Sequence, residues 1–149
     1  MPDQRTVLSY KALGITEGEH KAALEIRELF AAGTFHHDPE ALVDKPNGFN
    51  MNFAIDETKC GTTCCIGGWM WLAMNRDRTT FAPNAAQYVN NERSYALRDL
   101  FFPPQEEIGE INYDDITPGA ALAAIDSFLA GRLDWAAAVG ADMGEIDHA

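Results

Sequence analysis

The chain has 149 residues and a formal net charge of −12, with hydrophobic side chains at 46% and aromatic side chains at 10% of its positions. This length suffices for one sizeable hydrophobic core and is short for two. The apolar content excludes a wholly disordered chain in spite of the charge, so we expect one helical domain over residues 1–139 and an acidic, frayed tail over residues 140–149.

The sequence contains no apolar run near the roughly 18 residues that a membrane-spanning helix needs, and its first residues lack the apolar core of a signal peptide. All three cysteines lie within residues 60–65, and two are adjacent, which makes a disulfide framework a poor description. Reduced thiols are typical of the cytosol. We therefore expect a cytoplasmic protein that does not contact a membrane.

The first predicted helix begins after Thr16 and ends at Gly33. Thr16 and Glu19 have the spacing of a capping box, in which each side chain binds a backbone N–H of the other residue. Gly33 lies where a left-handed C-terminal cap is favoured. Apolar residues repeat between them at helical spacing: Ala22, Ala23, Ile26, Leu29 and Phe30.

The segments on either side of this helix give weaker patterns. Residues 6–10 fit either a short strand or the lead-in to a helix, and residues 34–47 predict a loop with at most one helical turn at 40–43. Residues 49–56 alternate apolar and polar side chains with a period of two, which predicts a strand. A lone strand cannot satisfy its own backbone, so this one either pairs with residues 7–10 or lies as an extended ribbon across helices.

Residues 60–72 hold the three cysteines and predict a loop, a cap and then a buried helix. Gly61 permits a tight turn, and Thr62 or Thr63 can cap a helix that follows Thr63 and ends near Asn75. Apolar side chains surround this helix on nearly every side, and the glycines at 67 and 68 allow another backbone to approach closely. We therefore place this helix at the centre of the fold.

The rest of the chain predicts further helices. One opens at Pro83, breaks near Asn90 and Asn91, and ends before Pro103; an acidic loop follows over residues 105–116. Thr117 and Pro118 then begin a helix that ends at Gly131, and residues 133–139 dock one short turn on the core. The predicted fold is mainly α, a single-domain helical bundle with a central buried helix and at most a small β-pair.

Several short motifs resemble those of a scattered set of small bacterial and phage-borne proteins. They are Phe49-Asn50-Met51, Cys60-Gly61-Thr62, Cys65-Ile66, Gly68-Trp69, Leu100-Phe101-Phe102-Pro103 and Ile116-Thr117-Pro118. The resemblance implies a shared, mostly helical domain over roughly residues 49–135. It implies no catalytic residue, and Cys64 departs from the small residue usual at its position in that set.

The cysteines have one structural interpretation, buried packing, and three chemical ones: thiol catalysis, metal ligation and redox sensing. Buried packing is the favoured role, since free cysteine behaves as a small hydrophobe. In the catalytic alternative, Cys64 lies at a helix start that favours its thiolate, with His36 or His37 as base. In the metal alternative, Cys60, Cys65, His36 and His37 supply ligands, although their spacing is not that of a zinc finger.

The charge is distributed unevenly along the chain. Residues 1–98 carry 12 acidic and 10 basic side chains, a net of −2, whereas residues 99–149 carry 11 acidic side chains and one arginine, a net of −10. Solubility alone is one explanation. The other explanation is that the acidic region binds a basic protein rather than nucleic acid, for example by imitating the phosphates of DNA. In this interpretation the protein is a non-enzymatic regulator that needs no cofactor. The expected contact residues are Glu106, Glu107, Glu110, Asp114 and Asp115.

Overall fold

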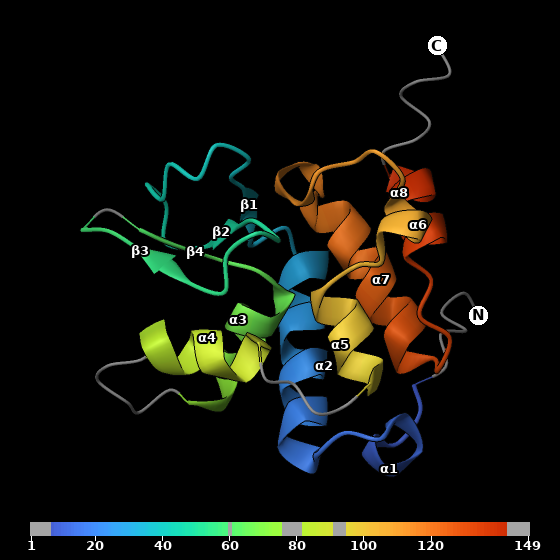
Figure 1. Ribbon diagram of the computed structural model, residues 1–149. Helices are drawn as coiled ribbons and strands as arrows, with labels where there is room; N and C mark the ends of the chain where they lie inside the picture. The colour runs from blue at the N-terminus through green and yellow to red at the C-terminus, as the bar shows by residue number, and fades with distance from the viewer. Residues whose placement is uncertain (1–6, 60, 76–81, 91–94, 143–149) are drawn as a thin grey trace.

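The computed structural model describes residues 7–59, 61–75, 82–90 and 95–142 (Figure 1). Its helices are α1 (Tyr10–Leu13), α2 (Glu17–Ala31), α3 (Ile66–Met74), α4 (Ala82–Asn90), α5 (Tyr95–Phe101), α6 (Gln105–Ile108), α7 (Pro118–Leu129), α8 (Trp135–Asp142) and the 3₁₀ turn η1 (Tyr113–Asp115). Its strands are β1 (His36–His37), β2 (Gly48–Phe49), β3 (Asp56–Glu57) and β4 (Thr62–Cys64). Within these described residues, no helix has the length and apolar character that crossing a membrane requires.

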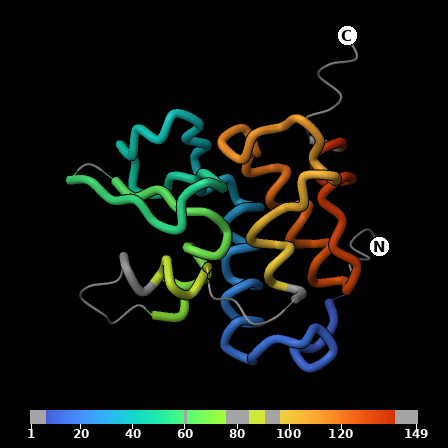
Figure 2. The backbone as a smooth tube through the Cα atoms, viewed as in Figure 1, coloured from blue at the N-terminus to red at the C-terminus, as the bar shows by residue number. Residues whose placement is uncertain are grey.

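Helix α2 lies between two groups of elements. It packs against α3 on one side and against α7 on the other, as the backbone trace also shows (Figure 2). The sheet, α3 and α4 lie on the first side, and α5 to α8 lie on the second (Figure 1). The helix at the centre is therefore α2, whereas α3 was predicted to occupy this place.

Helix α2 begins and ends where the sequence predicts. The Thr16 hydroxyl accepts a hydrogen bond from the Glu19 N–H (3.0 Å), and the Glu19 carboxylate accepts one from the Thr16 N–H (2.9 Å). The other carboxylate oxygen of Glu19 accepts a hydrogen bond from the Tyr88 hydroxyl (2.8 Å), which joins α2 to α4. Gly33 follows the helix with a φ of +75°, a conformation that glycine adopts without strain.

Helix α7 also has the predicted ends. The Thr117 hydroxyl accepts a hydrogen bond from the Ala120 N–H (3.1 Å), and Pro118 occupies the first helical position. Gly131 follows the helix with a φ of +84°. The buried faces of α2 and α7 belong to one hydrophobic core, and this burial stabilises both helices more than their intrinsic propensity does.

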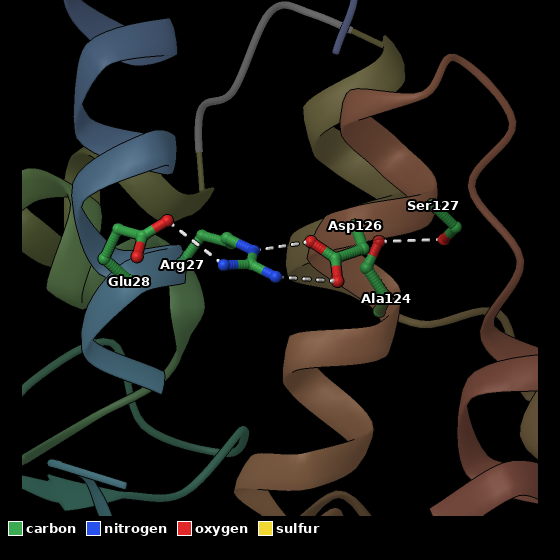
Figure 3. Close-up of polar contacts among 5 residues, drawn as sticks. All are labelled: Arg27, Glu28, Ala124, Asp126 and Ser127. Atoms are coloured by element: carbon green, nitrogen blue, oxygen red, sulfur yellow. Dashed lines mark hydrogen bonds and ion pairs between the residues drawn. The ribbon is translucent and has the colours of Figure 1, made fainter. Parts of the chain in front are cut away.

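An ion pair joins α2 to α7 (Figure 3). Nε of Arg27 lies 2.8 Å from Oδ1 of Asp126, and Nη2 lies 3.4 Å from Oδ2. The two side chains are 13% and 28% exposed, so solvent screens this pair less than a surface pair. The hydrogen bond with Asp126 raises the pKa of Arg27 although burial opposes the shift, which keeps the guanidinium charged.

A four-stranded mixed sheet lies beside the helices, with the strand order β1-β2-β4-β3. Strands β1, β2 and β4 are parallel, and β3 is antiparallel to β4. The structure is about 54% helical, so the fold is a mixed α/β arrangement. The prediction of a mainly α bundle with at most a small β-pair was therefore wrong. The strands are only two or three residues long, and such lengths are too short for a periodic pattern.

The single strand predicted over residues 49–56 is in fact two short strands. Strand β2 ends at Phe49, and the side-chain oxygen of Asn50 accepts a hydrogen bond from the Asn52 N–H (2.7 Å). An asparagine that binds its own backbone in this way turns the chain. The chain then returns as β3. Strand β2 pairs with β1 and β4 instead of with residues 7–10 or helices.

The N-terminal residues lead into a helix and do not form a strand. The Leu8 N–H donates a hydrogen bond to the carbonyl of Leu129 (2.8 Å), which fastens this segment to the end of α7. The Ser9 hydroxyl then caps α1 by accepting a hydrogen bond from the Ala12 N–H (3.1 Å). Of the two interpretations of residues 6–10, the helix lead-in is the one observed over the described residues.

Helix α3 begins later than predicted. Thr62 and Thr63 lie in strand β4, and Cys65 is the residue that caps the helix. Its sulfur accepts a hydrogen bond from the Gly68 N–H at 3.4 Å, so a thiol occupies a position that usually holds serine, threonine or aspartate. The helix ends at Met74 with Asn75 as its C-cap, which agrees with the predicted end near Asn75. Buried side chains connect it to α2, α4 and α5.

The C-terminal third contains more helix than expected. Helix α4 ends at the predicted break at Asn90, whereas Asn91 lies outside the described residues. The predicted acidic loop contains α6 and η1. Trp135 is fully buried, and its indole N–H donates a hydrogen bond to the Asp99 carbonyl (2.9 Å). Helix α8 continues to Asp142, within the stretch predicted as a tail, and residues 143–149 lie outside the described part.

Candidate functional site

Residues 105–115, here called the acidic segment, contain all five carboxylates predicted to contact a partner. They are Glu106, Glu107, Glu110, Asp114 and Asp115, and α6 and η1 hold four of them. Glu106, Glu110 and Asp115 are exposed, whereas Glu107 and Asp114 are half-buried. The structure therefore divides this set into two kinds of carboxylate.

Glu107 stabilises the start of helix α8. Its carboxylate accepts a hydrogen bond from the Trp135 N–H (2.9 Å), and the carboxylate of Asp134 accepts one from the Ala137 N–H (2.9 Å). The first N–H groups of a helix lack partners within the helix, and its dipole favours negative charge there. Part of the acidic excess in residues 99–149 thus has a structural explanation.

Asp114 fastens the acidic segment to the sheet. Its carbonyl oxygen accepts a hydrogen bond from Nε2 of His37 (2.9 Å), and its carboxylate accepts one from the side-chain amide of Asn52 (3.1 Å). His37 belongs to β1, and Asn52 follows β2. Asp114 therefore fixes the position of η1, whereas the carboxylates of Glu106, Glu110 and Asp115 are exposed.

The two described cysteines are sealed in the interior. Cys64 is 0% exposed and Cys65 is 2% exposed. Burial raises the pKa of the Cys64 thiol well above its ordinary value, and burial raises the pKa of Cys65 to about 11, although N–H groups at the start of α3 oppose the second shift. Desolvation thus outweighs the helix dipole at this site, and both groups are neutral thiols at pH 7.

The histidines lie apart from these thiols in the sheet. In the strand register, His37 is opposite Phe49, and Phe49 is opposite Cys64. Strand β2 thus separates the histidine strand from the cysteine strand, which places their backbones about 10 Å apart at the usual strand spacing. Cys60 lies outside the described residues. Among the described ones, no group of three or more His, Cys, Asp or Glu side chains could hold a metal ion.

Within the predicted loop over residues 34–47, residues 38–45, here called the Asp38 loop, are held by side-chain hydrogen bonds that the sequence did not predict. The carboxylate of Asp38 accepts hydrogen bonds from the N–H groups of Leu42 (2.8 Å) and Val43 (2.9 Å) and from the Thr63 hydroxyl (2.7 Å). Burial alone would raise the pKa of Asp38, but these hydrogen bonds lower it below its ordinary value. The helical turn predicted at residues 40–43 is absent because this carboxylate binds the N–H groups instead.

A pocket of about 100 Å³ lies beside this loop. Its lining residues come from positions 36–48 and include His36, His37, Asp38, Glu40, Leu42, Asp44 and Lys45. The only sequence signal for this arrangement is the Asp-Pro pair at 38 and 39, because aspartate commonly turns the chain by accepting its own backbone N–H groups. That signal predicts a turn but not a pocket.

The acidic segment and this pocket are the two surface features on which we base the function. The resemblance to small bacterial and phage-borne proteins stays a prediction. Neither a protein-family model nor a curated protein nor a solved structure matches the chain.

Proposed function

We propose that this protein is a non-enzymatic cytoplasmic interaction module that binds a basic protein through the exposed carboxylates of the acidic segment. The observation that supports this function is the combination of a net charge of −10 over residues 99–149 with exposed side chains at Glu106, Glu110 and Asp115. Such a surface attracts a positively charged partner, speeds the association and repels nucleic acid. The module then acts by competition, occupying the surface with which its partner binds nucleic acid.

The burial of the cysteines supports this function over an enzyme or metal centre. A thiol nucleophile must be deprotonated and accessible, and burial opposes both conditions at Cys64 and Cys65. Their side chains contribute to packing and to the cap of α3. The carboxylates of Glu106, Glu110 and Asp115, in contrast, are exposed to solvent.

Position distinguishes partner binding from mere solubility. Solubility depends on net charge, so carboxylates anywhere on the surface serve it equally. Binding depends on which carboxylates face the partner. Glu107 and Asp114 are unsuitable for a test because their substitution also removes hydrogen bonds that fix α8 and η1. Glu106, Glu110 and Asp115 are suitable because they are exposed.

The test compares two triple variants that change the net charge equally. One carries Glu106→Lys, Glu110→Lys and Asp115→Lys; the control carries Glu17→Lys, Glu57→Lys and Asp99→Lys, at exposed positions outside the acidic segment. The measured quantity is the dissociation constant of a fluorescent lysine-rich peptide. We expect the first variant to bind about tenfold more weakly or worse and the control to lose much less. Equal losses in both variants would favour solubility and contradict the proposal.

The ionic-strength dependence gives a second criterion. Exposed charges are screened within about 10 Å at 0.1 M salt, so raising the ionic strength from about 0.05 M to about 0.3 M weakens a complex of this kind. We expect the affinity of the unmodified protein for the peptide to fall steeply over this range. The triple variant in the acidic segment is expected to show a shallower dependence, because it has lost the charges that salt screens.

A further inference from the structure

The pocket beside the Asp38 loop combines negative charge with an apolar wall. Three acidic residues, Asp38, Glu40 and Asp44, line it together with one lysine, Lys45. Leu42 also lines it and is 61% exposed, the largest exposed fraction among the large hydrophobic side chains that the structure describes. A net negative pocket with an apolar wall matches a ligand that is cationic at one end and aliphatic along its length.

The Asp38 loop, whose residues line much of this pocket, is held in a fixed shape. Val43 is 1% exposed and has a φ of 53°, a conformation that a β-branched residue adopts only under constraint. The constraint comes from Asp38 and from the Thr58 hydroxyl, which donates a hydrogen bond to the Val43 carbonyl (2.7 Å). The Thr62 N–H binds the Lys45 carbonyl (2.9 Å). A loop held in this way loses little conformational entropy when a ligand binds.

We infer that this pocket binds a single lysine or arginine side chain of the basic partner, an inference that deepens the proposed function and rests on it. The aliphatic stem of that side chain packs on Leu42, and its charged head lies near Glu40 and Asp44. Nζ of Lys45 already lies 3.8 Å from Oδ1 of Asp44, with both side chains about half exposed. Such an exposed pair is weak, so a cation from the partner can replace it.

The pocket adjoins the acidic segment. His37 lines the pocket, and its Nε2 donates the hydrogen bond to the Asp114 carbonyl. One basic surface can therefore contact both features at once. The acidic segment then provides long-range attraction, and the pocket selects a partner that places one basic side chain at the correct point.

The test uses the full chain, labelled with ¹⁵N, and N-acetyl-lysine amide as the probe. N-acetyl-norleucine amide is the matched control ligand, because it has the aliphatic stem without the ammonium group. We expect saturable chemical-shift changes at the amides of Leu42 and Gly48 with the lysine compound and none with the norleucine compound. Changes scattered over exposed carboxylates, changes with both compounds, or no change at the pocket would each overturn the inference.

Three substitutions in the pocket are expected to act in opposite directions. Glu40→Gln and Asp44→Asn are each expected to lower the affinity for N-acetyl-lysine amide about two- to fivefold. Lys45→Gln is expected to raise that affinity, because it removes the competing cation. Glu57→Gln, an exposed carboxylate on β3, serves as the control and leaves the affinity unchanged. If the affinity depended on net charge alone, so that Glu57→Gln lowered it as much as Glu40→Gln does, the inference would also be overturned.

These results are separable from those that test the acidic segment. Failure of the lysine compound to bind the pocket, with the peptide still sensitive to Glu106→Lys, Glu110→Lys and Asp115→Lys, overturns the pocket and leaves the proposed function in place. If the lysine compound binds at the pocket but the affinity for the peptide is unchanged by those three substitutions, the proposed function is overturned.

Discussion

His37 and Asp114 are joined by a hydrogen bond of 2.9 Å from the imidazole Nε2 to the backbone carbonyl oxygen. His37 lies in β1 and Asp114 in η1, so this bond joins the sheet to the acidic segment. The neighbouring His36 is exposed. Both histidines line the pocket, but only His37 forms the hydrogen bond with Asp114.

Replacement of His37 by alanine is expected to lower the free energy of unfolding by about 1 kcal/mol, the usual contribution of one hydrogen bond. His36→Ala is the matched control and should change stability by less than about 0.5 kcal/mol, as exposed substitutions generally do. Urea unfolding measures both values. Amide hydrogen exchange at Asp115 should increase in the first variant alone. Equal effects of the two substitutions would mean that the hydrogen bond does not hold η1.

Asp38→Asn is expected to destabilise the protein by about 1–2 kcal/mol at pH 7, because an amide group cannot accept the hydrogen bonds that both carboxylate oxygens receive. The folded-state pKa of Asp38 lies below the ordinary value of 3.8. Its stabilising effect is therefore complete above pH 3.8 and is lost as the pH falls through the folded-state pKa.

The measurement for Asp38 is the difference in free energy of unfolding between the unmodified chain and Asp38→Asn, taken from pH 7 down to pH 3. That difference should shrink at the acidic end of the range. Asp44→Asn, an exposed position on the same loop, should give a small difference at every pH. A large and pH-independent difference for Asp38→Asn would show that the carboxylate charge is unimportant there.

Gly68→Ala is expected to be strongly destabilising. A Cβ at this position would collide with the carbonyl oxygen of Ala54 and lie 2.9 Å from Cβ of Cys64, and a backbone atom cannot move aside as a flexible side chain can. We expect a loss of at least about 2 kcal/mol in the free energy of unfolding. Gly140→Ala in α8, where a Cβ meets nothing within 4 Å, should instead be neutral or stabilise by up to about 1 kcal/mol. Thermal unfolding compares the two.

The buried thiols should react with a disulfide reagent only when the structure opens. In a Cys60→Ser background, which leaves Cys64 and Cys65, we expect labelling of the native protein at pH 7 to be at least about a hundredfold slower than in denaturant. The raised pKa of Cys65, about 11, also predicts that the free energy of unfolding falls as the pH rises above 9, since only the unfolded chain then loses the proton. Rapid labelling of native protein would restore the thiol-centred alternative.

Local signals in the sequence predicted the two principal helices. Thr16 with Glu19, and Thr117 with Pro118, act within one helical turn, and both ends are formed as expected. The glycines at 33 and 131 act equally locally, through their positive φ. In these two helices the capping residue and its hydrogen-bonding partner lie within about four positions, so the local sequence contained enough information to place the helix ends.

The sheet and the pocket depend on partners that lie far apart in the chain. Strand β4 pairs with β2 across the turn at Asn50, and the Asp38 carboxylate receives the hydroxyl of Thr63. No pattern within 36–37 or 48–49 indicates such pairing. Thr62 or Thr63 was predicted to cap α3, but both lie in β4, where the Thr63 hydroxyl binds Asp38, and Cys65 is the cap. The contact of Thr63 with Asp38 joins residues 25 positions apart, so no local pattern predicted the arrangement beside the pocket.

Chemical-shift mapping of the ¹⁵N-labelled chain with the lysine-rich peptide tests most directly whether the carboxylates, and not the thiols, are the working surface. We expect the largest changes at residues 105–115 and 36–48, and no more than small changes at residues 62–71. Changes concentrated on the cysteine-bearing segment, or spread evenly over every acidic position, would contradict the proposed function.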